Sequence, residues 1–305
     1  MTRVDAVLIA GPTASGKSRA ALELAEAIGG TIINADSMQV YREARVLTAR
    51  PSIEDMTRVP HALYGHVSVR EAYSVGRYQD DAAKTLTLVR AMTRVPIFVG
   101  GTGLYFAALT EGLADIPSIP ATVRVAARKK LDDIGVGALH AELAVRDPET
   151  ASRLRPSDPQ RVLRAYEVLE ATGLPLAHWQ TRTGKPVLDG LRLAKFVLDV
   201  PRAELRERIE TRFRAMLADG AQKEAAALKG LDPTLPAAKI LGLRELWALP
   251  TGELGEAEAI RLGVTATRQF AKRQTTWFRN RMADWNWLAA QQSGNILPPI
   301  LADVR

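Results

Sequence analysis

The fold is decided by the stretch Gly11-Pro12-Thr13-Ala14-Ser15-Gly16-Lys17-Ser18, which fits the pattern G-x-x-x-x-G-K-[ST]. An apolar run, Val4–Ala10, precedes it and predicts a buried strand, and a helical pattern begins near Lys17. The glycines allow backbone N–H groups to turn toward a phosphate, and the helix N-terminus adds its positive dipole end. Lys17 adds a full charge, and the Ser18 hydroxyl can reach Mg²⁺. We therefore expect Gly11–Ser18 to bind phosphate.

Three further apolar runs, Thr31–Asn34, Val95–Val99 and Leu191–Val200, alternate with helical patterns. This alternation predicts an α/β fold with a buried, mostly parallel sheet. Between 118 and 190 helical spacing takes over, and one helix there is expected to be capped by Asp158 and to end before Gly173. We therefore expect a core formed by residues 1–117 and 191–305, with a helical insertion domain at 118–190. Two more helices are expected at about 202–217 and 256–281.

Composition limits the possible classes of protein. The chain has 305 residues, of which 47% are apolar and 25% charged, enough for one large or two modest domains. It has no cysteine and four scattered histidines, so any metal is expected to be bound by oxygen. No apolar run reaches the roughly 18–20 residues of a membrane span, and the start of the chain does not resemble a secretory signal, so we expect a cytoplasmic protein. The net charge of +7 suits a polyanionic partner.

An aspartate and a glycine-rich turn follow two of the expected strands. Asp36 comes directly after Thr31–Asn34, so we expect it at the carboxyl edge of the sheet, beside the phosphate loop. An aspartate in this position can also be a simple helix cap or turn residue. The run Val95–Val99 ends in a turn, residues 100–103, where nucleoside triphosphatases carry a second metal-binding aspartate. Because this turn has no acid, ordinary ATP hydrolysis is not expected.

Six separated motifs resemble those of the tRNA dimethylallyltransferases in order and spacing, and the resemblance covers nearly the whole chain. They are Gly11–Ser18, Asp36–Arg42, Thr48–Pro51, Val99–Tyr105, Asp158–Arg161 and Lys272–Arg279. The resemblance implies a P-loop NTPase-like core whose loop holds the diphosphate of the donor and not ATP. It implies the transfer of a dimethylallyl group from dimethylallyl diphosphate to N6 of the adenine at position 37 of tRNA, 3′ of the anticodon, giving N6-isopentenyladenosine and diphosphate. Two positions differ from the family pattern, with Arg50 in place of lysine and Ser18 where threonine is common.

The resemblance also implies roles for individual residues. Asp36 would be the general base for the weakly nucleophilic adenine amine. Lys17 and a Mg²⁺ ion held at Ser18 would stabilise the charge that develops on the leaving diphosphate. Thr102 matches a residue that lines the channel where the substrates meet, and Arg212 matches an arginine that reaches the diphosphate. A plain turn threonine and a solvated surface arginine are the alternatives for these two positions.

Cations gather on the last expected helix. Arg261, Arg268, Lys272 and Arg279 fall on one strip beside its apolar face, and the absence of acids from the strip favours phosphate contacts. Trp277 lies off the strip and could stack on an unpaired base or pack in the core. Including residues that the resemblance assigns to tRNA contact, the expected set is Asp36, Ser37, Met38, Gln39, Thr102, Arg124, Gln160, Arg161, Val162, Leu163, Arg164, Lys239, Arg244, Arg268, Lys272, Arg273 and Arg279.

The sequence therefore favours an enzyme acting as a monomer on dimethylallyl diphosphate and the anticodon stem-loop of tRNA, with Mg²⁺ as cofactor. Two other functions stay open. An enzyme that prenylates a free adenine nucleotide would have no need of the basic strip on the last helix. A small-molecule kinase with the same loop would bind ATP with Mg²⁺ and release ADP.

Overall fold

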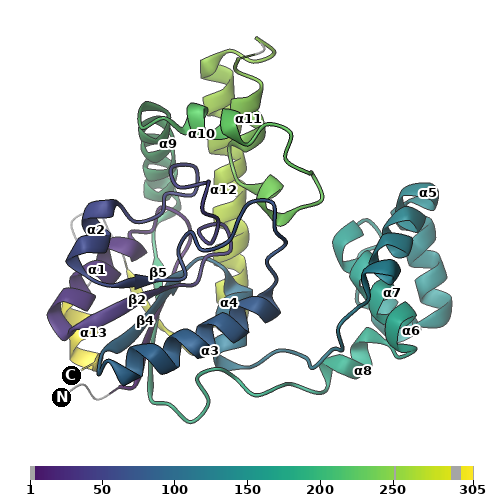
Figure 1. The fold of residues 1–305 in the computed structure, drawn as a ribbon, viewed down its shortest axis with the longest axis horizontal. Helices are drawn as coiled ribbons and strands as arrows, with labels where there is room; N and C mark the ends of the chain where they lie inside the picture. Colours follow the sequence, from purple (N-terminus) through teal and green to yellow (C-terminus); the bar gives the residue numbers. More distant parts are fainter. Residues whose placement is uncertain (1–3, 251, 290–296, 305) are drawn as a thin grey trace. The chain divides into compact units, whose positions relative to one another are not determined.

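The computed structural model describes residues 4–250, 252–289 and 297–304. It consists of two compact units, of which the larger includes the chain up to Thr110 and again from Val187, and the smaller spans Glu111–Pro186 (Figure 1). The sequence placed the insertion at 118–190, so the compact unit begins and ends a few residues earlier than that range. In the described residues, no helix is both long and apolar enough to cross a membrane.

A single sheet forms the centre of the larger unit. Within the described residues it has six strands in the order β3-β2-β4-β1-β5-β6, and each neighbouring pair is parallel, which confirms the expected parallel sheet. The strands are β1 (Ala6–Ala10), β2 (Gly30–Asn34), β3 (His61–Ala62), β4 (Val95–Gly100), β5 (Leu193–Asp199) and β6 (Asn286–Ala289).

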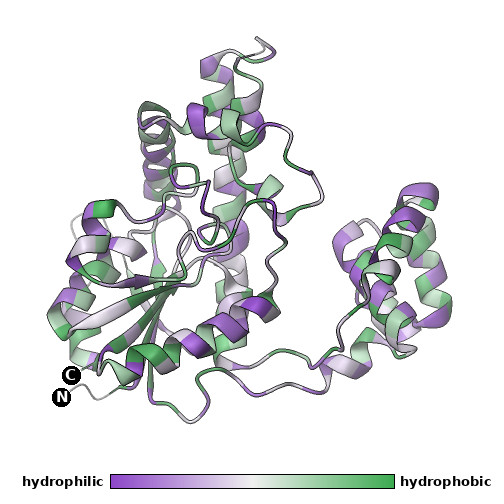
Figure 2. Cartoon of the chain, in the orientation of Figure 1, coloured by the Kyte–Doolittle hydropathy of each residue, from purple (hydrophilic) through white to green (hydrophobic). Residues whose placement is uncertain are grey.

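Both faces of the sheet are covered, which explains why its central strands are continuous apolar runs and not alternating ones. In β1, Leu8 packs into one hydrophobic cluster while Val7 and Ile9 pack into another, and all three are fully buried. Figure 2 shows these strands as mainly hydrophobic, surrounded by helices with mixed faces. The helices of this unit are α1 (Lys17–Ile28), α2 (Ile53–Arg58), α3 (Val75–Ala91), α4 (Gly103–Thr110), α9 (Arg202–Ala218), α10 (Ala221–Ala227), η1 (Pro236–Lys239), α11 (Leu243–Trp247), α12 (Glu256–Arg281) and α13 (Leu297–Val304).

Two of these helices carry residues toward the site. On α9 the apolar stripe expected from sequence is buried, with Leu205, Ile209 and Phe213 each less than a tenth exposed. The buried face of α12 includes Val264 and Phe278, again as the spacing predicts. Because these faces are buried, the rotation of each helix about its axis is fixed. Arg212 on α9 and Thr267 on α12 then line a pocket described below.

The smaller unit is helical, as expected, with α5 (Ala121–Arg146), α6 (Pro148–Ser152), α7 (Pro159–Thr172) and α8 (Leu176–Gln180). The caps predicted for α7 are present. The Asp158 carboxylate accepts the Arg161 N–H at 3.1 Å, Pro159 is the first helical residue, and Gly173 ends the helix with φ 68°.

Candidate functional site

The phosphate loop connects β1 to α1 at the carboxyl edge of the sheet. Gly16 has φ 87°, a left-handed conformation that favours glycine, and it immediately precedes α1. At Gly11, a Cβ would lie 2.6 Å from the Ser15 Oγ, so a side chain at this position would have to displace the Ser15 hydroxyl. The Ser15 hydroxyl is buried and has no hydrogen-bond partner within the protein. A buried, unpaired hydroxyl in this loop is a free polar group for a phosphate ligand.

Lys17 lies folded into the loop. Its Nζ donates to the Pro12 carbonyl at 3.2 Å, and the side chain is buried. The pKa of Lys17 is lowered to about 8, chiefly by burial; the Asp36 carboxylate opposes this shift, and repulsion by Arg212 adds to it. Lys17, Asp36 and Arg212 therefore share one electrostatic environment. The sequence predicts Asp36 and Arg212 near the phosphate loop, and in the structure both are close enough to shift the pKa of Lys17.

Asp36 follows β2 at the same edge of the sheet. Its backbone N–H donates to the Asn34 Oδ1 at 2.9 Å, and its own Oδ1 accepts the Met38 N–H at 3.0 Å. Asp36 is thus a turn residue, which was the other interpretation of this position from sequence. It also lines the pocket beside the phosphate loop. Thr102 lies against the same turn, where its Oγ1 accepts the Ser37 N–H at 2.9 Å and donates to the Ser37 Oγ at 3.1 Å. The sequence motifs around Asp36 and Thr102 therefore meet in space.

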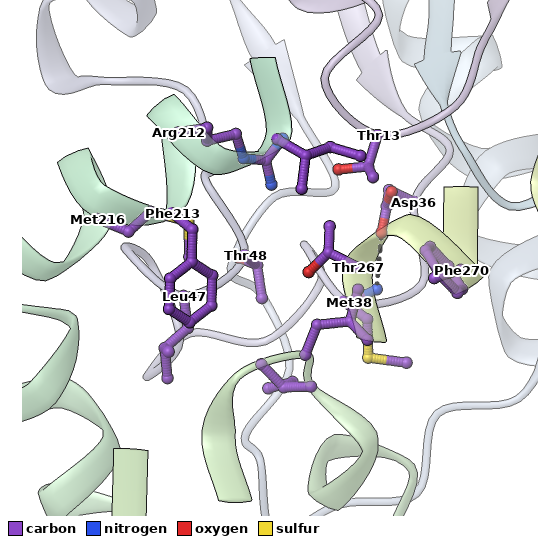
Figure 3. A pocket seen from close by; sticks show the side chains of 13 residues that line it. Thr13, Asp36, Met38, Leu47, Thr48, Arg212, Phe213, Met216, Thr267 and Phe270 are labelled. Atoms are coloured by element: carbon purple, nitrogen blue, oxygen red, sulfur yellow. Dashed lines mark hydrogen bonds between the residues drawn. The ribbon is translucent and has the colours of Figure 1, made fainter. Parts of the chain in front are cut away.

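A pocket lies where the phosphate loop, the Asp36 turn, α9 and α12 converge (Figure 3). Thr13, Arg212 and Asp36 lie along one side of it, and Leu47, Phe213 and Met216 lie across from them. Arg212 is partly buried and its side chain lines this pocket. Burial lowers the pKa of Arg212, and Asp36 opposes that shift. A polar side that carries the Arg212 guanidinium and faces an apolar side suits a ligand with an anionic head and a short apolar tail. The lining residues not expected from sequence are Leu47, Thr48, Ile209, Phe213, Met216, Ile240, Leu241, Thr267 and Phe270.

Gln274 is also absent from the residues expected from sequence. It is buried on α12, where its Oε1 accepts the Thr13 N–H at 2.9 Å and its Nε2 donates to the Gly101 carbonyl at 2.8 Å. The sequence contained a sign of this role, because Gln274 falls on the apolar face of α12 and a buried glutamine needs hydrogen-bond partners. The sequence could not say which partners these are.

Other residues of the motifs fasten the loops that surround the pocket. The Gln39 amide donates to the Thr48 carbonyl at 2.9 Å and to the Ala49 carbonyl at 2.8 Å, which engages both of its hydrogens. The Arg50 guanidinium donates to the Tyr41 carbonyl at 3.0 Å. Gln39 and Arg50 therefore tie two loops together, and Arg50, which was left outside the expected catalytic set, does not line the pocket. Met38 lines the pocket and Ser37 supports it.

A second groove, of about 940 Å³, runs between α9 and α12. Arg268, Lys272 and Arg279 line it from α12, and two cations not expected from sequence, Arg202 and Arg206, line it from α9. Asp199 is an acid in this groove, with its Oδ1 3.9 Å from the Arg279 guanidinium. The groove nevertheless gathers five cations against one acid.

The basic strip on α12 was expected to begin at Arg261 and to contain no acid, and the structure corrects both points. Arg261 pairs with Glu258 at 2.6 Å and does not line the groove, so an acid does accompany the strip one turn earlier. Trp277 packs against Gly103, where a Cβ would overlap its ring, and this contact favours the packing alternative for Trp277. Arg273 is exposed, with its guanidinium 5.7 Å from the centre of the Phe270 ring. Lys239 on η1 and Arg244 on α11 are exposed as well.

In the smaller unit, the residues expected to contact tRNA divide into two kinds. The exposed ones are Arg124, Gln160 and Arg161, and Arg164 is partly buried beside Glu167. Val162 and Leu163 are 0% and 5% exposed because they face the core of this unit, so their side chains offer no surface to an RNA. The expected contact of these two residues with tRNA stays a prediction, and it would have to be made by their backbone.

Comparisons with known proteins agree with this geometry. A family model described as IPP transferase matches residues 39–281, and one described as isopentenyl transferase matches residues 4–64. A tRNA dimethylallyltransferase from Azorhizobium caulinodans is 54% identical over 284 residues, covering 92% of this chain and 90% of the relative. One from a Bradyrhizobium species is 53% identical over 291 residues, 94% of this chain and 95% of the relative.

Solved structures give the same result. A tRNA isopentenylpyrophosphate transferase from Bacillus halodurans is 31% identical with a TM-score of 0.68, covering 98% of this chain and 94% of that one. A eukaryotic dimethylallyltransferase acting on tRNA is 26% identical with a TM-score of 0.79, covering 94% of this chain and 74% of that one. These relatives have the P-loop NTPase-like fold that the sheet and phosphate loop display here. By sequence, by fold and by the residues gathered at the carboxyl edge of its sheet, the chain belongs to the tRNA dimethylallyltransferase family.

Proposed function

We propose that this protein transfers a dimethylallyl group from dimethylallyl diphosphate to N6 of the adenine at position 37 of tRNA. The observation that carries the proposal is the two-sided pocket, in which Thr13, Asp36 and Arg212 face an apolar wall. Arg212 on the polar side suits the diphosphate, and the apolar wall suits a prenyl tail. Asp36, on the polar side, is the carboxylate available to the adenine amine.

The reaction requires one bond to form and one to break. The N6 lone pair attacks the first carbon of the prenyl group, the bond from that carbon to the diphosphate oxygen breaks, and the diphosphate leaves with the electron pair. Asp36 takes the proton that the amine loses. Lys17, Arg212 and the N-terminus of α1 stabilise the negative charge that gathers on the departing diphosphate. Thr102 supports this geometry by holding the turn that follows Asp36.

The site suits Mg²⁺ better than a softer metal. Ser18 is exposed at the start of α1, and among the described residues no group of three or more His, Cys, Asp or Glu side chains could bind a metal by itself. Mg²⁺ is commonly held by few protein oxygens together with phosphate oxygens and water. Ser18 and the diphosphate would hold it here, and when bound it neutralises diphosphate charge.

The basic groove supports RNA as the acceptor. Arg268, Lys272 and Arg279 line it, and cations set against phosphates supply sequence-independent affinity for RNA. Gln160 and Arg161, exposed on the smaller unit, are proposed as further tRNA contacts. We propose a monomer as the active unit. An anticodon stem-loop substrate supports the cytoplasm as its location.

A donor labelled in its prenyl group distinguishes this function from its rivals. Incubated with Mg²⁺ and an equimolar mixture of tRNA and AMP, the enzyme should place the label in tRNA at an N6-modified adenine and release diphosphate. Label in AMP would instead identify a free-nucleotide prenyltransferase. ADP formed from ATP in a parallel reaction without donor would identify a kinase.

A further inference from the structure

Gln274 joins two loops of the site that are far apart in the chain. Its side chain is 6% exposed, and both ends of its amide are paired inside the protein. The Oε1 accepts the Thr13 N–H of the phosphate loop at 2.9 Å, and the Nε2 donates to the carbonyl of Gly101 at 2.8 Å. Because one partner is a donor and the other an acceptor, the orientation of the amide is determined by the network.

The turn after β4 is shaped to receive this amide. A Cβ at Gly101 would overlap the Gln274 Nε2, so the amide approaches the backbone where there is no side chain. The same built Cβ would lie 3.3 Å from the Asp36 Oδ2. The Gln274 Nε2 and the Asp36 Oδ2 therefore lie on the same side of Gly101, where its missing side chain leaves room for both.

The connection continues to both sides of Asp36. Thr102, the residue after Gly101, donates its N–H to the Ala35 carbonyl at 3.2 Å, and its Oγ1 accepts the Ser37 N–H at 2.9 Å. Thr102 thus holds Ala35 and Ser37, the residues before and after Asp36. Its neighbour Gly101 is joined through Gln274 to the phosphate loop. Hydrogen bonds connect Thr13 through Gln274 to Gly101, the peptide bond connects Gly101 to Thr102, and Thr102 is hydrogen-bonded to the backbone on both sides of Asp36.

We propose that Gln274 is a positioning residue that fixes the position of the phosphate loop relative to Asp36. This inference rests on the proposed function, in which the loop holds the leaving diphosphate and Asp36 takes the proton of the adenine amine. Bond formation at the prenyl carbon requires both substrates in an aligned geometry, and a displacement of about 1 Å can cost on the order of a hundredfold in rate. Gln274 acts through Thr13 and Gly101 and contacts no substrate itself.

The test compares Gln274→Met with the wild type. Methionine has a similar length and volume but can make neither hydrogen bond. At saturating donor and tRNA, we expect kcat to fall about 10- to 100-fold, with tRNA Kd within about twofold. Gln222→Met, an exposed glutamine on α10, is the matched control and should keep the wild-type kcat. Thermal unfolding of each variant shows that the assay temperature leaves it folded.

A second variant separates positioning from simple stability. Gly101→Ala must displace the same amide, so its kcat should fall by a similar factor, and the double variant should lose little more than either single one. Multiplicative losses, or a Gln274→Met enzyme with a lowered Tm but the wild-type kcat when folded, would overturn the inference. A failure of the proposed function looks different, because the wild-type enzyme itself would then not prenylate tRNA.

Discussion

Asp36 holds a turn and is the base in the proposed reaction, and a single substitution can separate these two roles. Its Oδ1 accepts the Met38 N–H, and an asparagine oxygen can accept the same bond, so Asp36→Asn should keep the turn and the pocket. An amide cannot take the proton from the adenine amine, so we expect kcat to fall by about 10²–10⁴-fold, with tRNA affinity within a few-fold. Single-turnover kinetics and a filter-binding assay measure the two quantities. An Asn variant that retains kcat but binds tRNA weakly would mean that Asp36 only positions RNA.

Lys17 gives the donor affinity a pH dependence. Its pKa in the free protein is about 8, lowered from 10.5 chiefly by burial, so the amine becomes neutral as pH rises through 8. A bound diphosphate favours the charged amine, so donor Kd should be constant below pH 8 and should increase by up to about tenfold per pH unit above it. Titration of donor binding between pH 6.5 and 9.5 measures this, and Lys17→Met should bind weakly without the rise. A flat wild-type profile would remove Lys17 from the diphosphate contacts.

At the scale of elements, the predictable parts are those with long, regular patterns. β1, β4, α7 and α12 were expected from apolar runs, helical spacing and caps, because these signals lie within one segment of sequence. β3 has two residues and β6 has four partly exposed ones, so neither has enough apolar residues for a signal, and their pairing depends on neighbouring strands.

The same distinction holds for the site. Gly11–Ser18 and Asp36 could be found because their function requires fixed residue types at fixed spacing. Phe213 and Thr267 enter the pocket through the packing of α9 and α12, and the partners of Gln274 lie 261 and 173 residues away in the chain. Contacts between residues so far apart in the chain leave no local pattern in the sequence.

The close approach of β4 to the end of β2 makes a prediction about stability. At Gly100 a Cβ would overlap the backbone carbonyl of Ala35, which cannot move aside as a flexible side chain can. Gly100→Ala should therefore destabilise the fold by about 1–3 kcal/mol and displace the Asp36 turn. Gly76→Ala on α3, where the nearest atom is 3.8 Å away, is the control and should leave stability unchanged or slightly raised. Chemical denaturation measures both, and equal midpoints would show that the two strand ends can separate at no cost.

For the whole molecule, the question is whether the two compact units both contribute to RNA affinity. Their proposed contacts lie on different units, with Arg268 and Lys272 lining the groove of the larger one and Arg161 exposed on the smaller one. Removing the Arg161 side chain leaves the cap of α7 intact, because Asp158 accepts from its backbone N–H. Arg153→Ala, which removes an exposed arginine paired with Glu149 on the smaller unit, is the charge-matched control.

Salt dependence measures these contacts directly, since each phosphate neutralised by a cation contributes about 0.7–0.9 to the slope of log K against log salt. The Arg268→Ala, Lys272→Ala pair should flatten the slope for tRNA by roughly 1–2 and Arg161→Ala by a further 0.7–0.9 or so, while donor Kd stays unchanged. Because sites on separate units share no partners, the combined variant should show the sum of both changes. If Arg161→Ala changes the slope no more than Arg153→Ala does, RNA affinity resides in the larger unit alone. A loss of folded stability at an unchanged slope would mean that the α12 cations act through their packed stems.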